Sequence, residues 1–173
     1  MHVTLRTVDA IQCLRSPRAF PAVRRALAAA SRAAFRVIEF SVQNEHVHLI
    51  AEADDARALS GGVRGVVIRI ARAVNLMLSR RGRVFGDRYH ARAFTTPRAV
   101  RNALVYVLMN FRKHLRSGTE IDPCSSAGWF SGFRDPRVAI GPGLPPVRPP
   151  RTWLARFGWR RHGLIDVREA PRT

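Results

Sequence analysis

The chain has 173 residues, 46% of them hydrophobic, and carries 30 Lys and Arg against 12 Asp and Glu, a formal net charge of +18. This length suits one domain with room for an appendage. No apolar run approaches the roughly 18 residues that cross a bilayer, and the first residues lack the apolar stretch of a secretory signal. We therefore expect a soluble, cytoplasmic protein with no membrane partner. Cys13 and Cys124 are too far apart for a clustered metal site, which favours reduced structural thiols.

The positive charge is concentrated in the middle third of the chain. Residues 57–116 contain thirteen arginines and Lys113 against the single acid Asp87. Such a concentration favours a polyanionic partner, nucleic acid in preference to an anionic membrane. Of the 30 basic residues 29 are arginine, which suits forked contacts with phosphate, although a GC-rich coding sequence would produce the same bias.

Hydrophobic periodicity predicts a strand, a helix and a hairpin in the first third of the chain. Alternation over residues 2–8 indicates a strand, and the apolar residues of 18–34 recur at helical spacing. Residues 35–42 and 46–53 read as two further strands, because both are rich in β-branched or apolar residues. The three polar residues between them predict a hairpin.

Two more helices are predicted in the basic third. The first covers roughly residues 60–81, with its start signalled either by Asp54-Asp55 or by Ser60-Gly61-Gly62. Residues 84–95 read as an extended segment. Thr96 followed by proline then opens a helix over about 97–116.

The hairpin carries the sequence His46-Val47-His48 at the start of its second strand. Successive side chains of a strand point to opposite faces, so the two imidazoles share one face. Two imidazoles on one face can provide half of a metal site. The alternative is a pair of exposed histidines on a solvated face, because short His-x-His matches also arise by chance.

The helix over 97–116 places a tyrosine and an asparagine on the side away from its apolar arc. Tyr106 and Asn110 are separated by four residues, so their side chains are neighbours on the helix surface. The chain has one other tyrosine, Tyr89, which we interpret as a partly buried strand aromatic. The alternative for Tyr106 is an ordinary amphipathic surface tyrosine.

The segment after residue 116 is loop-like and rich in proline. Residues 152–162 are basic and aromatic, and they could dock on the body of the protein or contact nucleic acid; we favour docking. We therefore divide the chain into a domain of residues 1–116 and a C-terminal extension of residues 117–173.

This order of elements, with Glu45-His46-Val47-His48 on the hairpin and Tyr106-x-x-x-Asn110 on the helix, resembles the single-tyrosine HUH transposases of the insertion-sequence-200 type. Within them it resembles the branch associated with repetitive extragenic palindromes. The resemblance covers about residues 2–116. It implies an α+β fold with a ferredoxin-like antiparallel sheet and helices packed on it, here followed by the Pro-rich extension.

The resemblance also implies roles for individual residues. His46 and His48 would be metal ligands, Asn110 the third protein ligand and Tyr106 the nucleophile, which forms a link to the 5′ end of cut DNA. A Mg²⁺ or Mn²⁺ ion would polarise a phosphate oxygen. Lys113 is a candidate helper for deprotonating the tyrosine. The phosphate backbone of a single-stranded or hairpin DNA would contact arginines of the basic helix and the segment after it, namely Arg64, Arg69, Arg72, Arg80, Arg81, Arg83 and Arg88.

The chain departs from the family pattern in two places. Family members commonly have a proline where this chain has Asn44, and they often have a proline directly after the helical asparagine, where this chain has Phe111. Without that second proline we expect the helix to continue for another turn.

Three functions fit these residues. The first is a metal-dependent DNA endonuclease and strand transferase that works through Tyr106. The second is a DNA- or RNA-binding protein derived from such an enzyme that no longer cuts. The third is a hydrolytic metallonuclease that uses activated water. The sequence leaves open whether the chain acts as a monomer or as a homodimer.

Overall fold

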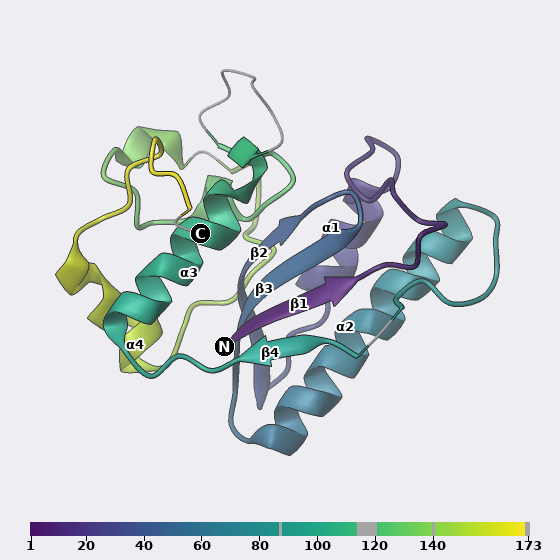
Figure 1. Cartoon of the computed structure of the whole chain (residues 1–173), viewed down its shortest axis with the longest axis horizontal. Coiled ribbons are helices and arrows are strands. Elements are labelled where there is room, and N and C mark those ends of the chain that lie inside the picture. Colours follow the sequence, from purple (N-terminus) through teal and green to yellow (C-terminus); the bar gives the residue numbers. More distant parts are fainter. Residues whose placement is uncertain (87, 114–120, 140, 172–173) are drawn as a thin grey trace.

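The computed structural model describes residues 1–86, 88–113, 121–139 and 141–171. Its sheet contains four antiparallel strands in the order β2-β3-β1-β4 (Figure 1). The strands are β1 (His2–Arg6), β2 (Phe35–Val42), β3 (His46–Ala53) and β4 (His90–Arg92). Helix α1 (Phe20–Ala28) follows β1, and helix α2 (Ala56–Met77) follows β3. This chain order and strand order form the ferredoxin-like α+β arrangement, which confirms the predicted fold class.

One face of the sheet packs against α1 and α2. Alternation along the strands places Val3, Phe40, Val47 and Leu49 on this face, where they are fully buried. The apolar stripe of α2 covers them with Val63, Val66, Ile70 and Val74. Figure 1 shows α2 lying along the side of the sheet opposite α3.

The other face packs against α3 (Pro97–Met109), which Thr96 caps by accepting a hydrogen bond from the Ala99 amide. Its buried side chains join Ile38 and Ile50 of the sheet in a second core. Residues of the C-terminal extension complete this core, among them Phe130, Trp159 and Ile165. Helix α3 is therefore enclosed on two sides, between the sheet and the extension.

A β-bulge in β2 sets which side chains reach the α3 face. The register shifts between Val37 and Glu39, so that Ile38 is the additional residue on this strand. Val37 packs in the first core and Ile38 in the second, while Glu39 is paired with Ile50. The bulge thus allows β2 to bury Phe40 on one face and the Glu39 carboxyl on the other.

The C-terminal extension also covers the free edge of β2. The Val42 amide donates to the Cys124 carbonyl, and the Ser126 amide donates to the Phe40 carbonyl. Farther along the edge, the Arg148 amide donates to the Val37 carbonyl. The extension contains α4 (Trp153–Arg156) and the short 3₁₀ helices η2 (Ala127–Trp129), η3 (Pro136–Val138) and η4 (Gly158–His162). Trp159 is 2% exposed, so the predicted docking of residues 152–162 on the body is confirmed.

Helix α2 confirms one of its two predicted starts, the one at Asp54-Asp55, but ends earlier than predicted. Helix α2 starts at Ala56, because the Asp55 carboxylate caps the Ala58 amide; Ser60-Gly61-Gly62 therefore lies inside the helix. A Cβ at Gly62 would lie 2.1 Å from the Phe35 ring, so glycine is required there by close packing. Helix α2 ends at Met77, before the predicted position 81, since Ser79 adopts a left-handed conformation with φ 50°.

Helix α3 also ends earlier than predicted. The α-helix stops at Met109 and tightens into the 3₁₀ helix η1 (Asn110–Lys113), a common way for a helix to end. The chain therefore stays helical for the expected further turn, but as a 3₁₀ helix up to residue 113. The predicted domain boundary at residue 116 lies outside the described residues. Within the described ranges, no helix combines the length and apolar character needed to cross a membrane.

Candidate functional site

A pocket of about 660 Å³ opens on the α3 face of the sheet, beside the turn of the β2-β3 hairpin. The two predicted metal ligands of β3, the predicted nucleophile of α3 and the first residue of η1 all line it. The pocket is therefore the place where the predicted catalytic and metal-binding residues come together. Its lining residues are Thr4, Arg15, Gln43, Asn44, Glu45, His46, His48, Tyr106, Asn110 and Phe111.

The two histidines of β3 lie on the same face of the sheet, as the alternation predicts. Their ring centroids are 6.0 Å apart and the ring planes differ by 11°. His48 is 6% exposed, whereas the His46 side chain keeps 30% of its surface exposed. The pair thus extends from the buried floor of the pocket to its opening, and the alternative of two solvated histidines does not describe His48.

Both imidazoles are held in the neutral form that can bind a metal ion. Burial lowers the pKa of His48 to about 3, and the neighbouring His2 and His46 contribute to the shift. Burial also lowers the pKa of His46, against the opposing effect of Glu45. His48 Nδ1 lies 3.2 Å from Thr4 Oγ1 on β1. A proton on Nδ1 shared with Thr4 leaves the lone pair of Nε2 available.

The hairpin turn before His46 is fixed by backbone hydrogen bonds from the segment after β1. The Thr7 amide donates to the Glu45 carbonyl over 2.8 Å, and the Leu14 amide donates to the Asn44 carbonyl. Within the turn, the Gln43 amide donates to the His46 carbonyl over 2.7 Å. These bonds position the first histidine on a rigid support.

Helix α3 brings Tyr106 to the floor of the pocket. The Tyr106 ring stands perpendicular to the His48 ring, with a centroid distance of 5.3 Å. Asn110 is one turn farther along, is 5% exposed, and begins η1. The spacing of four residues predicted that these side chains are neighbours, and both line the pocket that contains the histidine pair.

His2 is a further member of this cluster that the sequence reading missed. Its ring centroid lies 5.5 Å from that of His48 and 5.4 Å from that of Tyr106. Its Nε2 is buried and, among the described residues, has no hydrogen-bond partner. The alternation of residues 2–8 placed His2 and Thr4 on one face, but the pairing of β1 with β3 could not be read from it.

The donor set fits a divalent cation in part. Two neutral imidazoles and an amide oxygen suit Mn²⁺ better than Mg²⁺, which prefers oxygen ligands. Among the described residues, no three His, Cys, Asp or Glu side chains gather at a metal-binding distance. A third protein ligand at this pocket would therefore come from an amide such as Asn110.

The predicted DNA-binding arginines lie away from this pocket. Arg64, Arg69 and Arg72 belong to α2, which packs on the opposite face of the sheet, and Arg69 donates back to the Gly65 carbonyl. Arg80, Arg81 and Arg83 follow the same helix, and Arg88 precedes β4. None of these seven lines the pocket.

Arg6 and Arg15 are cations on the side of the sheet that carries the pocket. Arg6 is paired with His46 across β1 and β3, and side chains paired in this way share a face. Arg15 lines the pocket, but its guanidinium is held by Asp122 at 2.8 and 2.9 Å and by the Val42 carbonyl. Arg6, which is 59% exposed, is thus the more accessible of the two.

The remaining two predictions concern Lys113 and Tyr89. Lys113 is the last residue of η1, and its side chain lies outside the described part of the chain. Tyr89 packs against the core on the α1 and α2 side of the sheet. Its partial burial agrees with the prediction, but Tyr89 directly precedes β4, so its interpretation as a strand residue is wrong.

The fold is similar to that of a solved REP-associated tyrosine transposase bound to a REP hairpin. The TM-score is 0.58 and the sequence identity 18%, over 72% of this chain and 74% of that chain. At this identity the comparison shows a shared fold, which is the fold that the sequence resemblance implied. No family model matches the sequence, and no match is found among curated proteins.

Proposed function

We propose that the chain is a transposase-like endonuclease that cuts and rejoins single-stranded DNA through a phosphotyrosine at Tyr106. The observation that carries the proposal is the meeting of Tyr106, Asn110 and two neutral histidines in one pocket. The fold shared with a tyrosine transposase that was solved on a DNA hairpin supports the same substrate class. The high positive charge of the chain is compatible with that substrate.

In the proposed reaction, the Tyr106 oxygen attacks a phosphodiester phosphorus. The new bond joins the tyrosine to the 5′ phosphate, and the bond to the 3′ oxygen breaks. The phenol gives up its proton, and the departing oxygen takes one to become a free 3′ hydroxyl. The phosphotyrosine is itself a reactive ester. The 3′ hydroxyl of a second strand can therefore attack it, which rejoins DNA and releases the tyrosine.

His46, His48 and Asn110 are the residues we propose to hold Mn²⁺ or Mg²⁺. When bound, the ion would polarise a phosphate oxygen as a Lewis acid. The buried packing of His48 against Thr4 and Tyr106 would keep the ligand and the nucleophile in a fixed relation. Lys113 remains our proposed helper in removing the phenol proton.

A denaturing gel tests the proposal. A single-stranded DNA hairpin labelled at its 3′ end is incubated with the protein and Mn²⁺, so that the label stays on the fragment joined to the protein. We expect a slowly migrating covalent adduct, which is lost in Tyr106→Phe and retained in Tyr89→Phe. A 5′-labelled copy should yield a shorter fragment with an extendable 3′ hydroxyl.

The other outcomes would replace the proposal. Cleavage that survives Tyr106→Phe would indicate hydrolysis by activated water. A shift on a native gel with no cleavage under any metal condition would indicate a binding protein that does not cut.

A further inference from the structure

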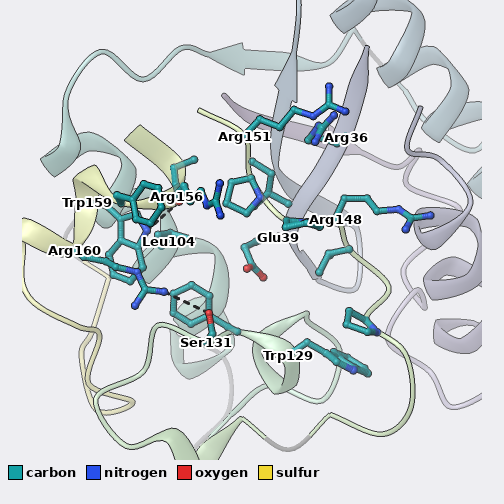
Figure 2. Close-up of a pocket in the computed structure, with 18 residues that line it drawn as sticks. Arg36, Glu39, Leu104, Trp129, Ser131, Arg148, Arg151, Arg156, Trp159 and Arg160 are labelled. Atoms are coloured by element: carbon teal, nitrogen blue, oxygen red, sulfur yellow. Dashed lines mark hydrogen bonds between the residues drawn. The ribbon is translucent and has the colours of Figure 1, made fainter. Parts of the chain in front are cut away.

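A second cavity, of about 790 Å³, lies between the bulged strand β2, helix α3 and the C-terminal extension (Figure 2). It shares no lining residue with the Tyr106 pocket. Its volume falls within the roughly 300–1,000 Å³ of small-molecule sites. The cavity therefore has the size of a ligand site and is separate from the proposed catalytic centre.

Glu39 provides a buried carboxyl in this cavity. The residue is 7% exposed, and Figure 2 shows its carboxyl group pointing into the cavity. One carboxyl oxygen, Oε2, accepts a hydrogen bond from Ser126 Oγ, whereas no described residue bonds to Oε1. Burial raises the pKa of Glu39 to about 8, so the group is mainly neutral at pH 7. A neutral carboxyl offers a donor and an acceptor side by side.

The walls around this carboxyl are aromatic and apolar. Trp159 and Phe130 line the cavity and stack on each other with ring centroids 5.7 Å apart. Leu104 of α3 and the rings of Pro149 and Pro150 supply further flat or apolar surface. Such walls suit a planar ligand, because stacking requires faces that are already in place.

The rim is formed by arginines. Two of them already have partners within the protein. The Arg36 guanidinium lies 3.9 Å from the Glu52 carboxylate, and the Arg151 side chain donates to the Ala33 carbonyl. Arg156 and Arg160 stack on neighbouring aromatic rings and have no ion pair with an acid in the described ranges. Figure 2 shows both on the Trp159 side of the cavity. These guanidinium groups can meet phosphate at the entrance.

We propose that this cavity binds one unpaired nucleobase of a nucleic-acid strand, with the base against the aromatic and proline-lined wall, its polar edge at Glu39, and a neighbouring phosphate at Arg156. Each base presents adjacent donors and acceptors on its Watson–Crick edge, which a neutral carboxyl can match. A simple anion would use the arginines but would gain nothing from Glu39. The identity of the strand as the DNA substrate rests on the proposed function, whereas nucleotide binding at the cavity does not.

Nucleotide binding can be measured without metal or cleavage. The full chain is titrated with the four deoxynucleoside 5′-monophosphates and with 2-deoxyribose 5-phosphate, which lacks a base. The readout is tryptophan fluorescence, excited at the red edge, because Trp129 and Trp159 both line the cavity. We expect saturable quenching by the nucleotides. The base-free sugar phosphate should bind at least about tenfold more weakly than they do.

Three variants locate the binding at Glu39 and the rim. Glu39→Gln keeps a donor and an acceptor, so it should bind within about twofold of the native chain, whereas Glu39→Met should bind about tenfold more weakly. Arg156→Gln should weaken nucleotides and sugar phosphate alike. Arg168→Gln, an exposed change in the same extension that does not line the cavity, is the matched control. Thermal unfolding of each variant checks that it folds.

Equal affinity for nucleotides and sugar phosphate would reduce the cavity to an anion site and overturn the proposal. Absence of binding, or native affinity in Glu39→Met, would also overturn it. These outcomes are distinguishable from failure of the proposed function. A chain that binds nucleotides here but forms no DNA adduct would contradict the proposed function and leave the nucleotide site standing.

Discussion

The ring of Tyr106 stands at 90° to the ring of His48, with 5.3 Å between their centroids. Tyr106 reaches this position from α3 and His48 from the middle of the sheet. The contact therefore joins the proposed nucleophile to a proposed metal ligand. The same contact also packs the helix on the sheet. A substitution at Tyr106 therefore has to separate chemistry from packing.

Tyr106→Phe and Tyr106→Ala make that separation. Phe keeps the edge-to-face contact, so we expect the free energy of unfolding to change by less than about 1 kcal/mol. Ala removes the ring, and we expect a loss of about 2 kcal/mol. Urea unfolding measures both, while DNA adduct formation should be absent from both. Adduct formation by the Phe variant would remove Tyr106 from the mechanism.

Thr4 positions His48 and should influence the affinity for metal. Thr4→Val has nearly the same shape but removes the oxygen that lies 3.2 Å from His48 Nδ1. We expect Mn²⁺ to bind about tenfold more weakly, because the ring loses the partner that fixes its orientation. Calorimetric titration gives the affinity.

Thr95→Val, at an exposed position before α3, is the control for this change and should bind Mn²⁺ as the native chain does. Equal affinities in both variants would show that Thr4 does not orient a metal ligand.

The core of the site was predictable because it depends on local periodicity. The spacing of His46 and His48 fixes their common face on any strand, and the spacing of Tyr106 and Asn110 fixes their proximity on any helix. The periodicity similarly predicted the strands β1, β2 and β3. These features need no knowledge of which strand pairs with which.

The remaining features depend on contacts between distant parts of the chain. His2 joins the site only because β1 pairs with β3, and Glu39 is buried only because Ile38 forms a bulge and Ser126 returns to β2. Sequence periodicity also could not show that the arginines of α2 lie across the sheet from Tyr106. The apolar stripe of a helix identifies its buried side but not the face of the sheet it covers.

Arg6 and Arg72 offer a test of where DNA lies. Arg6 shares the face of His46, whereas Arg72 is an exposed residue of α2 on the opposite side. We expect Arg6→Gln to weaken binding of a DNA hairpin about fivefold. The slope of log affinity against log salt concentration should also become shallower by about one, as expected for the loss of one phosphate contact. Arg72→Gln should have the smaller effect.

Fluorescence anisotropy over a series of salt concentrations measures both quantities. A larger loss of affinity in Arg72→Gln would place the DNA strand along α2. It would then support the predicted contact between DNA and the arginines of that helix.

The buried Glu39 carboxyl should make stability fall as the pH rises. Its pKa is raised from the ordinary 4.5 to about 8 in the folded chain. Between these values the folded state holds a proton that the unfolded state has lost, so rising pH favours unfolding. The slope approaches about 1.4 kcal/mol per pH unit in the middle of this range. The other ionisable groups that line the cavity are Arg36, Arg148, Arg151, Arg156 and Arg160.

Glu39→Gln removes this titration while preserving a neutral side chain of nearly the same shape. The variant should match the native chain near pH 5 and become progressively more stable than it toward about pH 8. Urea unfolding at several pH values gives the difference between the two free energies of unfolding, in which the titration of all other groups cancels. Parallel pH profiles would mean that Glu39 is ionised in the folded chain, and would remove the neutral carboxyl from the cavity.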